Sequence, residues 1–247
     1  WLHGVHFAAD GMRGWAVGAG GTVLATRDGG GTWVAQAAGA RSELSSITFA
    51  DAGLRGWAVG ADGTLLATDD GGGTWTPQSS GTDAMLSKPE VSGDGLSAWM
   101  VGSDGRVIST HDGGRTWNVR SSSNEESLNA LHMTGDGRRG WAVSAQGSVL
   151  ASVDGGNTWT RQASGTEELL FAVHFARDAS RGWIVGGGGT VLATGNGGAT
   201  WAPQASGTKA ALFSVSFGRD GLHGCAVGSG GTVISTRDGG ATWTASV

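Results

Sequence analysis

The sequence predicts an all-β protein, a six-bladed β-propeller of four-stranded antiparallel blades. A Trp, once replaced by Cys, returns every 42 residues, at Trp15, Trp57, Trp99, Trp141, Trp183 and Cys225. A second ladder keeps the same register, at Trp33, Trp75, Trp117, Trp159, Trp201 and Trp243. Each unit also holds short runs of alternating apolar residues, and the 48 Gly of the chain supply turns between them. One four-stranded unit copied six times at this length is typical of propeller blades.

The first unit shows the expected strands in order. They are Val5–Phe7, Trp15–Gly18, Thr22–Thr26 and Thr32–Gln36, and their separators are Asp10-Gly11, Gly20-Gly21 and Asp28-Gly29-Gly30-Gly31. Alternation with period two in short runs predicts strands, and helical spacing is absent. Each unit is therefore expected to be a meander of four strands joined by hairpin turns.

The turn between the second and third strands repeats in every unit. It is Gly20-Gly21, Asp62-Gly63, Asp104-Gly105, Gln146-Gly147, Gly188-Gly189 and Gly230-Gly231. A two-residue hairpin turn needs positive φ, which Gly adopts without strain. Pro77 and Pro203 fall in fourth strands and Pro89 in a first strand, and Pro is tolerated at a sheet edge because it has no N–H to pair. We therefore expect the first and fourth strands to be the two edges of each blade.

The repeat spans the whole chain and predicts a single domain over residues 1–247. The expected blades cover roughly 1–36, 43–78, 85–120, 127–162, 169–204 and 211–247. Within them, the alternating positions of the Trp ladders predict a core that fills the space between blades. Cys225 occupies one of these core positions and, as the only Cys, has no internal disulfide partner.

Charge and composition exclude several classes of protein. The net charge is −5, only 15% of residues are charged, and no basic stripe is present, so a nucleic-acid partner is not expected. No apolar run is long enough to span a membrane. The sequence starts at Trp1, already in repeat register, which favours a processed leader and hence an organelle-lumen, periplasmic or secreted protein, although a trimmed chain would begin the same way.

Every unit carries Ser/Thr-x-Asp-x-Gly-x-Thr-Trp between its third and fourth strands. The acidic position is Asp28, Asp70, Asp112, Asp154, Asn196 and Asp238, and Asn196 keeps the acceptor but loses the charge. We expect this side chain to accept hydrogen bonds within its own loop, while Gly takes the left-handed position and Trp packs against the neighbouring blade. This favours a structural role for the motif over ligand contact.

The motif resembles the Asp-box, also called the bacterial neuraminidase repeat. The fuller pattern Gly-Trp-Ala-Val-Gly, Gly-Thr-Val-Leu-Ala-Thr and Asp-Gly-Gly-x-Thr-Trp is similar to the Asp-box propellers that include the photosystem II assembly and stability factor family. That family has seven blades, whereas this chain has six units. The resemblance implies a non-catalytic scaffold that binds a protein partner during assembly or stabilisation of a photosynthetic membrane protein complex, in the thylakoid lumen and without a cofactor.

Two other functions are compatible with the repeat. A multivalent carbohydrate-binding lectin would stack sugars on exposed indoles, although the alternating Trp positions favour the core. A glycoside hydrolase is the third possibility. Sialidase chemistry uses a Tyr nucleophile, and the chain has no Tyr. Six nearly even copies also argue against one evolved active site, so we do not expect an enzyme.

Two polar columns appear when the units are stacked. The first is His6, Thr48, Glu90, His132, His174 and Ser216, which alternation places along a central channel. Three His and one Glu are metal-ligand types, but their spread over several blades predicts that no metal is bound. The second column is Arg13, Arg55, Ser97, Arg139, Arg181 and His223, next to several Asp. It predicts either a rim that contacts a partner or local Asp–Arg pairs.

Overall fold

The chain folds into six four-stranded antiparallel sheets, seen in a computed structural model that describes residues 1–50, 53–121 and 126–246. In every sheet the strands are hydrogen-bonded in chain order, so each sheet is a simple meander. We name the sheets blades 1 to 6 in chain order. The predicted fold class, an all-β six-bladed propeller of four-stranded blades, is confirmed.

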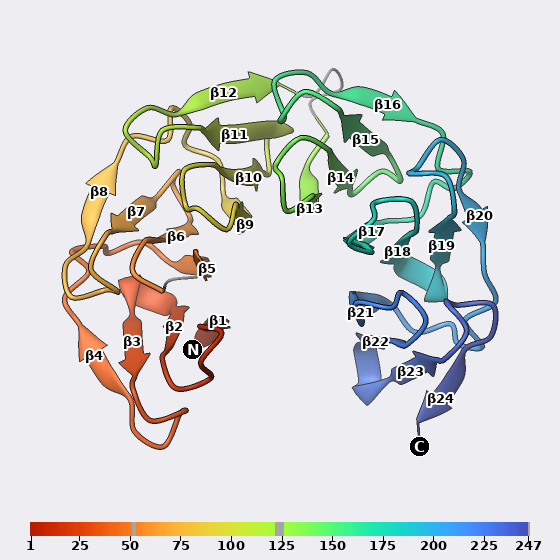
Figure 1. The fold of residues 1–247 in the computed structure, drawn as a ribbon, viewed down its shortest axis with the longest axis horizontal. Coiled ribbons are helices and arrows are strands. Elements are labelled where there is room, and N and C mark those ends of the chain that lie inside the picture. Colours follow the sequence, from red (N-terminus) through yellow and green to blue (C-terminus); the bar gives the residue numbers. More distant parts are fainter. Residues whose placement is uncertain (51–52, 122–125, 247) are drawn as a thin grey trace. The chain divides into compact units, whose positions relative to one another are not determined.

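The chain divides into two compact units, Trp1–Ser121 and Ser122–Val247. Unit 1 holds blades 1 to 3 and unit 2 holds blades 4 to 6 (Figure 1). The assignment of all six blades to one domain stays a prediction. Val247, with which the sixth predicted blade ends, lies outside the described residues.

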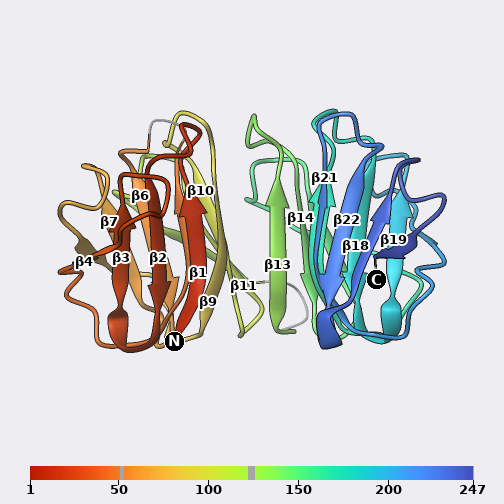
Figure 2. The same ribbon diagram turned by 90° about the horizontal axis from the view of Figure 1, so that it is seen from below.

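Unit 1 contains strands β1 to β12. Blade 1 consists of β1 (Leu2–Phe7), β2 (Gly14–Gly18), β3 (Val23–Thr26) and β4 (Val34–Gln36). Blade 2 consists of β5 (Leu44–Phe49), β6 (Gly56–Gly60), β7 (Leu65–Thr68) and β8 (Thr76–Gln78). Blade 3 consists of β9 (Leu86–Val91), β10 (Ala98–Gly102), β11 (Arg106–Thr110) and β12 (Asn118–Ser121). The strands β1, β2 and β3 run side by side in Figure 2.

Unit 2 repeats the plan with strands β13 to β24. Blade 4 consists of β13 (Leu128–Met133), β14 (Gly140–Ser144), β15 (Val149–Ser152) and β16 (Thr160–Gln162). Blade 5 consists of β17 (Leu170–Phe175), β18 (Gly182–Gly186), β19 (Val191–Thr194) and β20 (Ala202–Pro203). Blade 6 consists of β21 (Leu212–Phe217), β22 (Gly224–Gly228), β23 (Val233–Thr236) and β24 (Thr244–Ser246).

The first strand of each blade lies at the inner side of its unit, and the fourth strand lies at the outer side (Figure 1). Pro77 and Pro203 lie in the fourth strands β8 and β20, and Pro89 lies in the first strand β9. All three prolines therefore occupy strands at a sheet edge, where a missing N–H leaves no ladder bond unmade.

The hairpin between the second and third strands has the backbone that its sequence requires. In blade 2, Asp62 and Gly63 have φ of 55° and 62°. A Cβ at Gly63 would also clash with the carbonyl oxygen of Thr82, so Gly is needed there for space as well as for φ. Three of these hairpins contain a single 3₁₀ turn, which the sequence did not predict: η1 (Ala19–Gly21), η2 (Gly187–Gly189) and η3 (Ser229–Gly231).

The first Trp ladder forms the core between successive blades. Trp183 is only 1% exposed and stacks on Phe217 of the next blade, with ring centroids 3.5 Å apart and an interplanar angle of 10°. The pairs Trp15–Phe49 and Trp141–Phe175 repeat this stack. Blade 3 has Val91 at the Phe position, and Trp57 instead meets Trp117 edge-on. The expectation that this ladder is core is therefore met at its five Trp positions.

Cys225 is the exception, because it is exposed rather than buried. The equivalent Trp183 is covered by blade 6, which follows it in unit 2. Blade 6 is the last blade among the described residues, so none of them forms a later blade over Cys225. The prediction of a core position is wrong for this residue, since burial on this face depends on the blade that follows.

Candidate functional site

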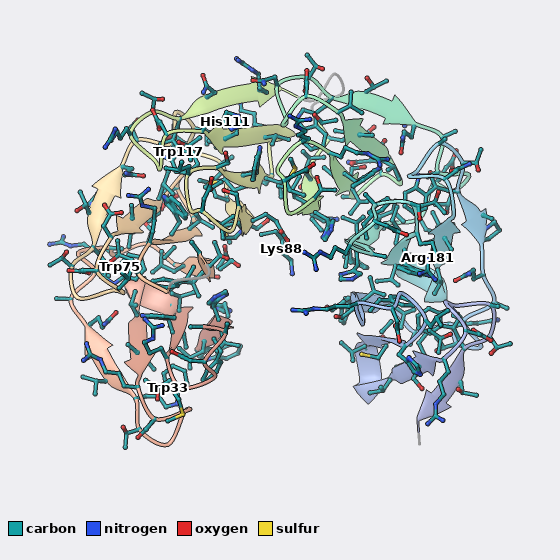
Figure 3. All side chains as sticks on the ribbon, viewed as in Figure 1. Trp33, Trp75, Lys88, His111, Trp117 and Arg181 are labelled. Atoms are coloured by element: carbon teal, nitrogen blue, oxygen red, sulfur yellow. The ribbon has the colours of Figure 1, made fainter. Side chains whose placement is uncertain are left out.

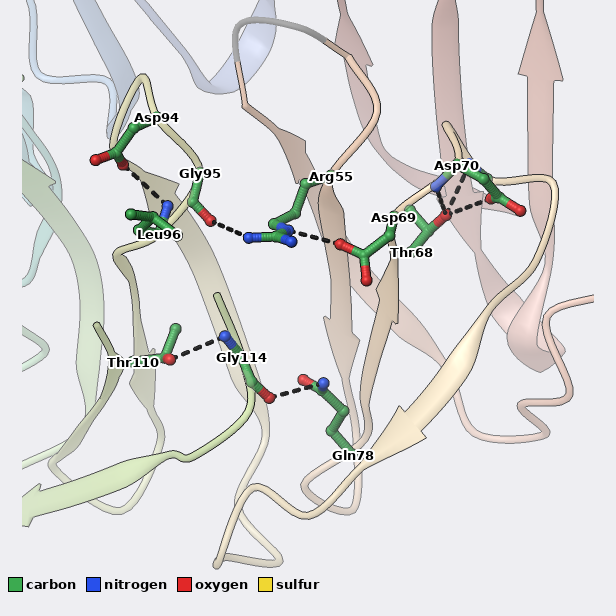
Figure 4. Close-up of polar contacts among 11 residues, drawn as sticks. Arg55, Thr68, Asp69, Asp70, Gln78, Asp94, Gly95, Leu96, Thr110 and Gly114 are labelled. Carbon is green, nitrogen blue, oxygen red and sulfur yellow. Dashed lines mark hydrogen bonds and ion pairs between the residues drawn. The ribbon is translucent and has the colours of Figure 1, made fainter. Parts of the chain in front are cut away.

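The Asp-box side chains act as hydrogen-bond acceptors inside their own loops. Oδ1 of Asp70 accepts a bond from the Thr68 hydroxyl at 2.8 Å (Figure 4). Oδ1 also accepts a bond from the Thr74 backbone N–H (2.9 Å), and Oδ2 accepts one from the Thr74 hydroxyl (2.8 Å). These bonds lower the pKa of Asp70 from 3.8 to about 2, and the bond from the Thr74 N–H has the largest effect. The same three bonds recur at Asp28, Asp112, Asp154 and Asp238.

Asn196 preserves this arrangement without a charge. Its Oδ1 accepts bonds from the Thr194 hydroxyl (2.9 Å) and the Thr200 backbone N–H (3.0 Å), and its Nδ2 donates to the Thr200 hydroxyl (2.9 Å). The loop therefore depends on the shape and acceptors of the side chain more than on its charge. All six Asp-box side chains are occupied by their own loops, which leaves them poorly placed to bind a ligand.

The second Trp ladder ties neighbouring blades together by hydrogen bonds. The indole Nε1–H of Trp117 donates to Oε1 of Gln78 (2.8 Å). In turn, Nε2 of Gln78 donates to the carbonyl of Gly114 at 2.8 Å (Figure 4). Equivalent Trp–Gln bonds hold Trp75, Trp201 and Trp243. Figure 3 shows Trp33, Trp75 and Trp117 towards the outer side of unit 1. These indoles are at most half-exposed, and sugar stacking on them stays an untested prediction.

The four arginines predicted as a partner rim bind loops of their own protein. The Arg55 guanidinium pairs with Asp69 (2.6 Å) and donates to the Gly95 carbonyl in blade 3 (3.4 Å) (Figure 4). Arg181 donates to the Asp220 and Gly221 carbonyls in blade 6 (2.7 and 3.1 Å). Arg13 pairs with Asp10 and reaches Gly53, and Arg139 lies over the Trp141 ring and reaches Gly197. These contacts join adjacent blades, and a role in partner binding stays a prediction.

The predicted channel residues fall into separate groups. In unit 1, His6 on β1 lies near Trp15 and Phe49, whereas Glu90 lies on β9 opposite Trp99. Burial raises the pKa of Glu90 from 4.5 to about 7, against the opposing effect of Lys88. In unit 2, His132 on β13 and His174 on β17 come together, with ring centroids 5.3 Å apart. Within the described ranges, no three His, Cys, Asp or Glu side chains are grouped to hold a metal.

The histidine pair lines a pocket of 380 Å³ at the inner side of unit 2. Burial, and then the proximity of His174, lowers the pKa of His132 to about 4, and burial also lowers that of His174. Both imidazoles are therefore neutral near pH 7 and are able to donate and accept hydrogen bonds. The rest of the wall is backbone and side chains from the ends of the three first strands and the turns after them: Met133, Thr134, Gly135, Phe175, Ala176, Arg177, Phe217, Gly218 and Arg219.

Arg177 and Arg219 give this pocket its charge. Both are exposed, and neither forms a salt bridge with any residue in the described part of the chain. The pocket wall contains no carboxylate. It therefore presents two guanidinium groups and two neutral imidazoles, a set of donors suited to an anionic group. The carboxylate pair that most glycosidases require does not line it.

These two arginines were not among the predicted site residues. In blades 5 and 6, Arg177 and Arg219 occupy the same position of the repeat. Blades 1, 3 and 4 carry Ala9, Gly93 and Gly135 at this position, and Asp51 of blade 2 lies outside the described residues. The signal was a departure from the repeat in two consecutive blades. A change confined to two units does not form a polar column, which is the pattern that predicted the other site residues.

No helical segment in the described residues has the length and apolar character needed to cross a membrane.

A family model described as photosynthesis system II assembly factor YCF48 matches residues 1–82, 91–164 and 161–245. No curated protein matches the chain in sequence.

Solved structures resemble the chain over its whole length. YCF48 from Cyanidioschyzon merolae is 25% identical, with a TM-score of 0.78, and the match covers 99% of this chain and 84% of that one. A structure described as YCF48 bound to D1 peptide is 23% identical, with a TM-score of 0.76, covering 100% and 82%. The GH74 enzyme of Niastella koreensis is 13% identical, with a TM-score of 0.78, but only 45% of that enzyme is covered. The GH74 likeness concerns the fold alone.

Proposed function

Because the chain belongs to the photosystem II assembly factor YCF48 family, whose model matches nearly its entire length, we propose that it is a non-catalytic propeller that binds a protein partner. In this proposal it serves the assembly or stabilisation of a photosynthetic membrane protein complex. The likeness to YCF48 bound to D1 peptide supports a peptide segment of such a complex as the kind of partner.

The observation that carries the proposal is the pocket of unit 2. Arg177 and Arg219 project positive charge without a salt-bridge partner among the described residues, and His132 and His174 add neutral hydrogen-bonding groups. Guanidinium groups bind carboxylates through paired, charge-assisted hydrogen bonds. The pocket therefore fits an acidic side chain or a terminal carboxylate of a bound segment.

The proposal is tested by binding of a fluorescein-labelled D1 peptide, followed by fluorescence anisotropy. The double variant Arg177→Glu/Arg219→Glu should weaken binding by tenfold or more, because two attractive charges become repulsive. The matched control Arg41→Glu/Arg115→Glu makes the same change of net charge at two exposed arginines of unit 1. Binding should also weaken as salt is added, since exposed charges are screened.

Equal affinities of the two double variants would refute the proposed site, because only net charge would then matter. A failure of the unaltered protein to bind the D1 peptide, combined with binding of a glycan, would refute the function itself and favour the lectin.

A further inference from the structure

A second departure from the repeat lies on the inner wall of the same blades. The second residue of each first strand is polar in blades 1 to 4 and Phe in blades 5 and 6: His3, Ser45, Ser87, Asn129, Phe171 and Phe213. The Ser45 hydroxyl donates to the Leu86 carbonyl (2.6 Å), and Nδ2 of Asn129 donates to the Leu170 carbonyl (2.8 Å). In blades 2 and 4 this side chain therefore joins two adjacent first strands by a hydrogen bond.

Blade 5 replaces that bond by an aromatic contact. The rings of Phe171 and Phe213 meet edge-to-face, with centroids 5.3 Å apart and an interplanar angle of 72°. Phe213 is 49% exposed and Phe171 is half-buried, and the nearby Leu169 is also exposed. The inner wall of blades 5 and 6 thus presents an apolar surface at a position where the repeat otherwise places polar groups.

The apolar surface and the charged pocket lie on the same two strands. Phe171 and His174 are three residues apart on β17, or about 10 Å in an extended chain, and Arg177 follows shortly after the end of that strand. Phe213, Ser216 and Arg219 repeat this order from β21 onward. Both strands lie at the inner side of unit 2 (Figure 1). An extended segment lying along this wall would meet aromatic rings at one end and guanidinium groups at the other.

We propose that the inner wall of blades 5 and 6 binds an extended partner segment at two points, an acidic group at Arg177 and Arg219 and an apolar side chain on the Phe171–Phe213 pair. The inference rests on the proposed function and specifies its partner. The two side chains of the segment are separated by about four to six residues, because an extended chain rises about 3.3 Å per residue and the arginine side chains shorten the span. The guanidinium groups attract the acidic group of the segment by charge complementarity, and the exposed Phe rings contact its apolar side chain.

The test compares two short fluorescein-labelled Gly/Ser peptides. One carries a pair of Glu residues only, and the other adds a Leu about five residues from that pair. The intact chain should bind the second peptide about tenfold more tightly, since the Leu becomes buried against the rings. A third peptide, with the Leu directly beside the Glu pair, should bind like the first.

The variant Phe171→Ser/Phe213→Ser introduces the residue that blades 2 and 3 carry at this position. It should abolish the advantage of the Leu peptide and leave the Glu-only peptide unaffected. The control Val153→Ser/Leu222→Ser removes two other exposed apolar side chains of unit 2 and should change neither affinity. Unchanged urea midpoints verify that all variants are folded.

Retention of the Leu advantage in the Phe variant would overturn the inference, while the proposed function would stand if Glu-peptide binding still required Arg177 and Arg219. Loss of that arginine dependence would remove both. Concentration-dependent self-association in analytical ultracentrifugation that disappears in the Phe variant would also overturn the inference, because the rings would then bind a second copy of the chain.

Discussion

Replacement of Trp183 by Cys tests the principle that blades are held together by indoles. The sequence itself makes this exchange at Cys225, the equivalent position of blade 6. Trp183 is almost completely buried, stacks on Phe217 at 3.5 Å and donates its Nε1–H to the Gly239 carbonyl at 2.9 Å. Trp183→Cys therefore removes a packed ring and a hydrogen bond from the interface between blades 5 and 6.

The magnitude follows from burial. A buried Trp removes about 150–250 Å² from water, which at about 25 cal/mol per Å² is worth roughly 4–6 kcal/mol. The Cys that replaces it recovers a small part, and the cavity left behind adds a cost. Since truncations of buried Trp to Ala cost about 3–5 kcal/mol, we expect Trp183→Cys to lower the free energy of unfolding by about 3–5 kcal/mol.

The assay is urea denaturation followed by far-ultraviolet circular dichroism, with the midpoint and slope fitted separately. Trp183→Phe, which retains a ring able to stack, should lose distinctly less than Trp183→Cys. The control Cys225→Ser alters an exposed residue in the equivalent place and should change stability by no more than about 0.5 kcal/mol. A loss below about 1 kcal/mol for Trp183→Cys would show that the stack does not hold the blades together.

Substitutions at three further positions test the loops and the inner strands. Asp70→Ala should lower the urea midpoint because it leaves the Thr68 and Thr74 donors unsatisfied, whereas Asp70→Asn should nearly preserve it, as Asn196 does in blade 5. Because the folded-state pKa of Asp70 is lowered to about 2, its stabilisation should be lost as pH falls from about 4 to about 2, and Asp70→Asn should lack this part of the acid sensitivity. Arg181→Met should cost about 1–2 kcal/mol in urea denaturation through loss of its two bonds to blade 6. Glu90→Gln should remove a decline in stability between about pH 4.5 and pH 7, since the pKa of Glu90 is raised from 4.5 to about 7 in the folded protein and the protonated form is favoured there.

For each of these variants, a different result would contradict the expected role of the residue. Equal midpoints for Asp70→Ala and Asp70→Asn would mean that the acceptors do not support the loop. An unaltered midpoint for Arg181→Met would leave that arginine available for partner binding. Identical pH profiles for the unaltered protein and Glu90→Gln would show that the carboxyl group titrates normally in the folded protein.

The sequence predicted the fold well because each of the six repeats contains the same short turn and strand patterns, which depend only on neighbouring residues. A hairpin that requires positive φ at Gly63, and a loop in which Asp70 accepts three bonds, are properties of a few neighbouring residues. Repetition at a constant spacing then fixed the number of blades. Burial was less predictable, because it depends on neighbours in space: Cys225 has the register of a core residue, but no later blade follows blade 6 among the described residues.

The candidate site was predicted only in part. The polar column predicted on the first strands contains His132 and His174, which the structure brings together. The expected spread concerned the three His and Glu90 together, and the close approach of the first strands of adjacent blades explains why two of these residues meet. Arg177 and Arg219 were not predicted because they occupy a turn position at which blades 1, 3 and 4 carry small or apolar residues.

The distribution of departures distinguishes the proposed functions. A lectin with one site per blade would need its contact residues in every unit, since each unit would have to form the same pocket. Here Phe171 and Arg177 depart from the repeat together, and Phe213 and Arg219 repeat both departures in the next blade. Two adjacent blades therefore differ from the repeat in the same way, at both ends of their inner strands. This pattern is expected for a ligand that lies along these strands and contacts both of them. The regular positions stabilise the blades, and the irregular ones form the surface that we propose to bind a single partner.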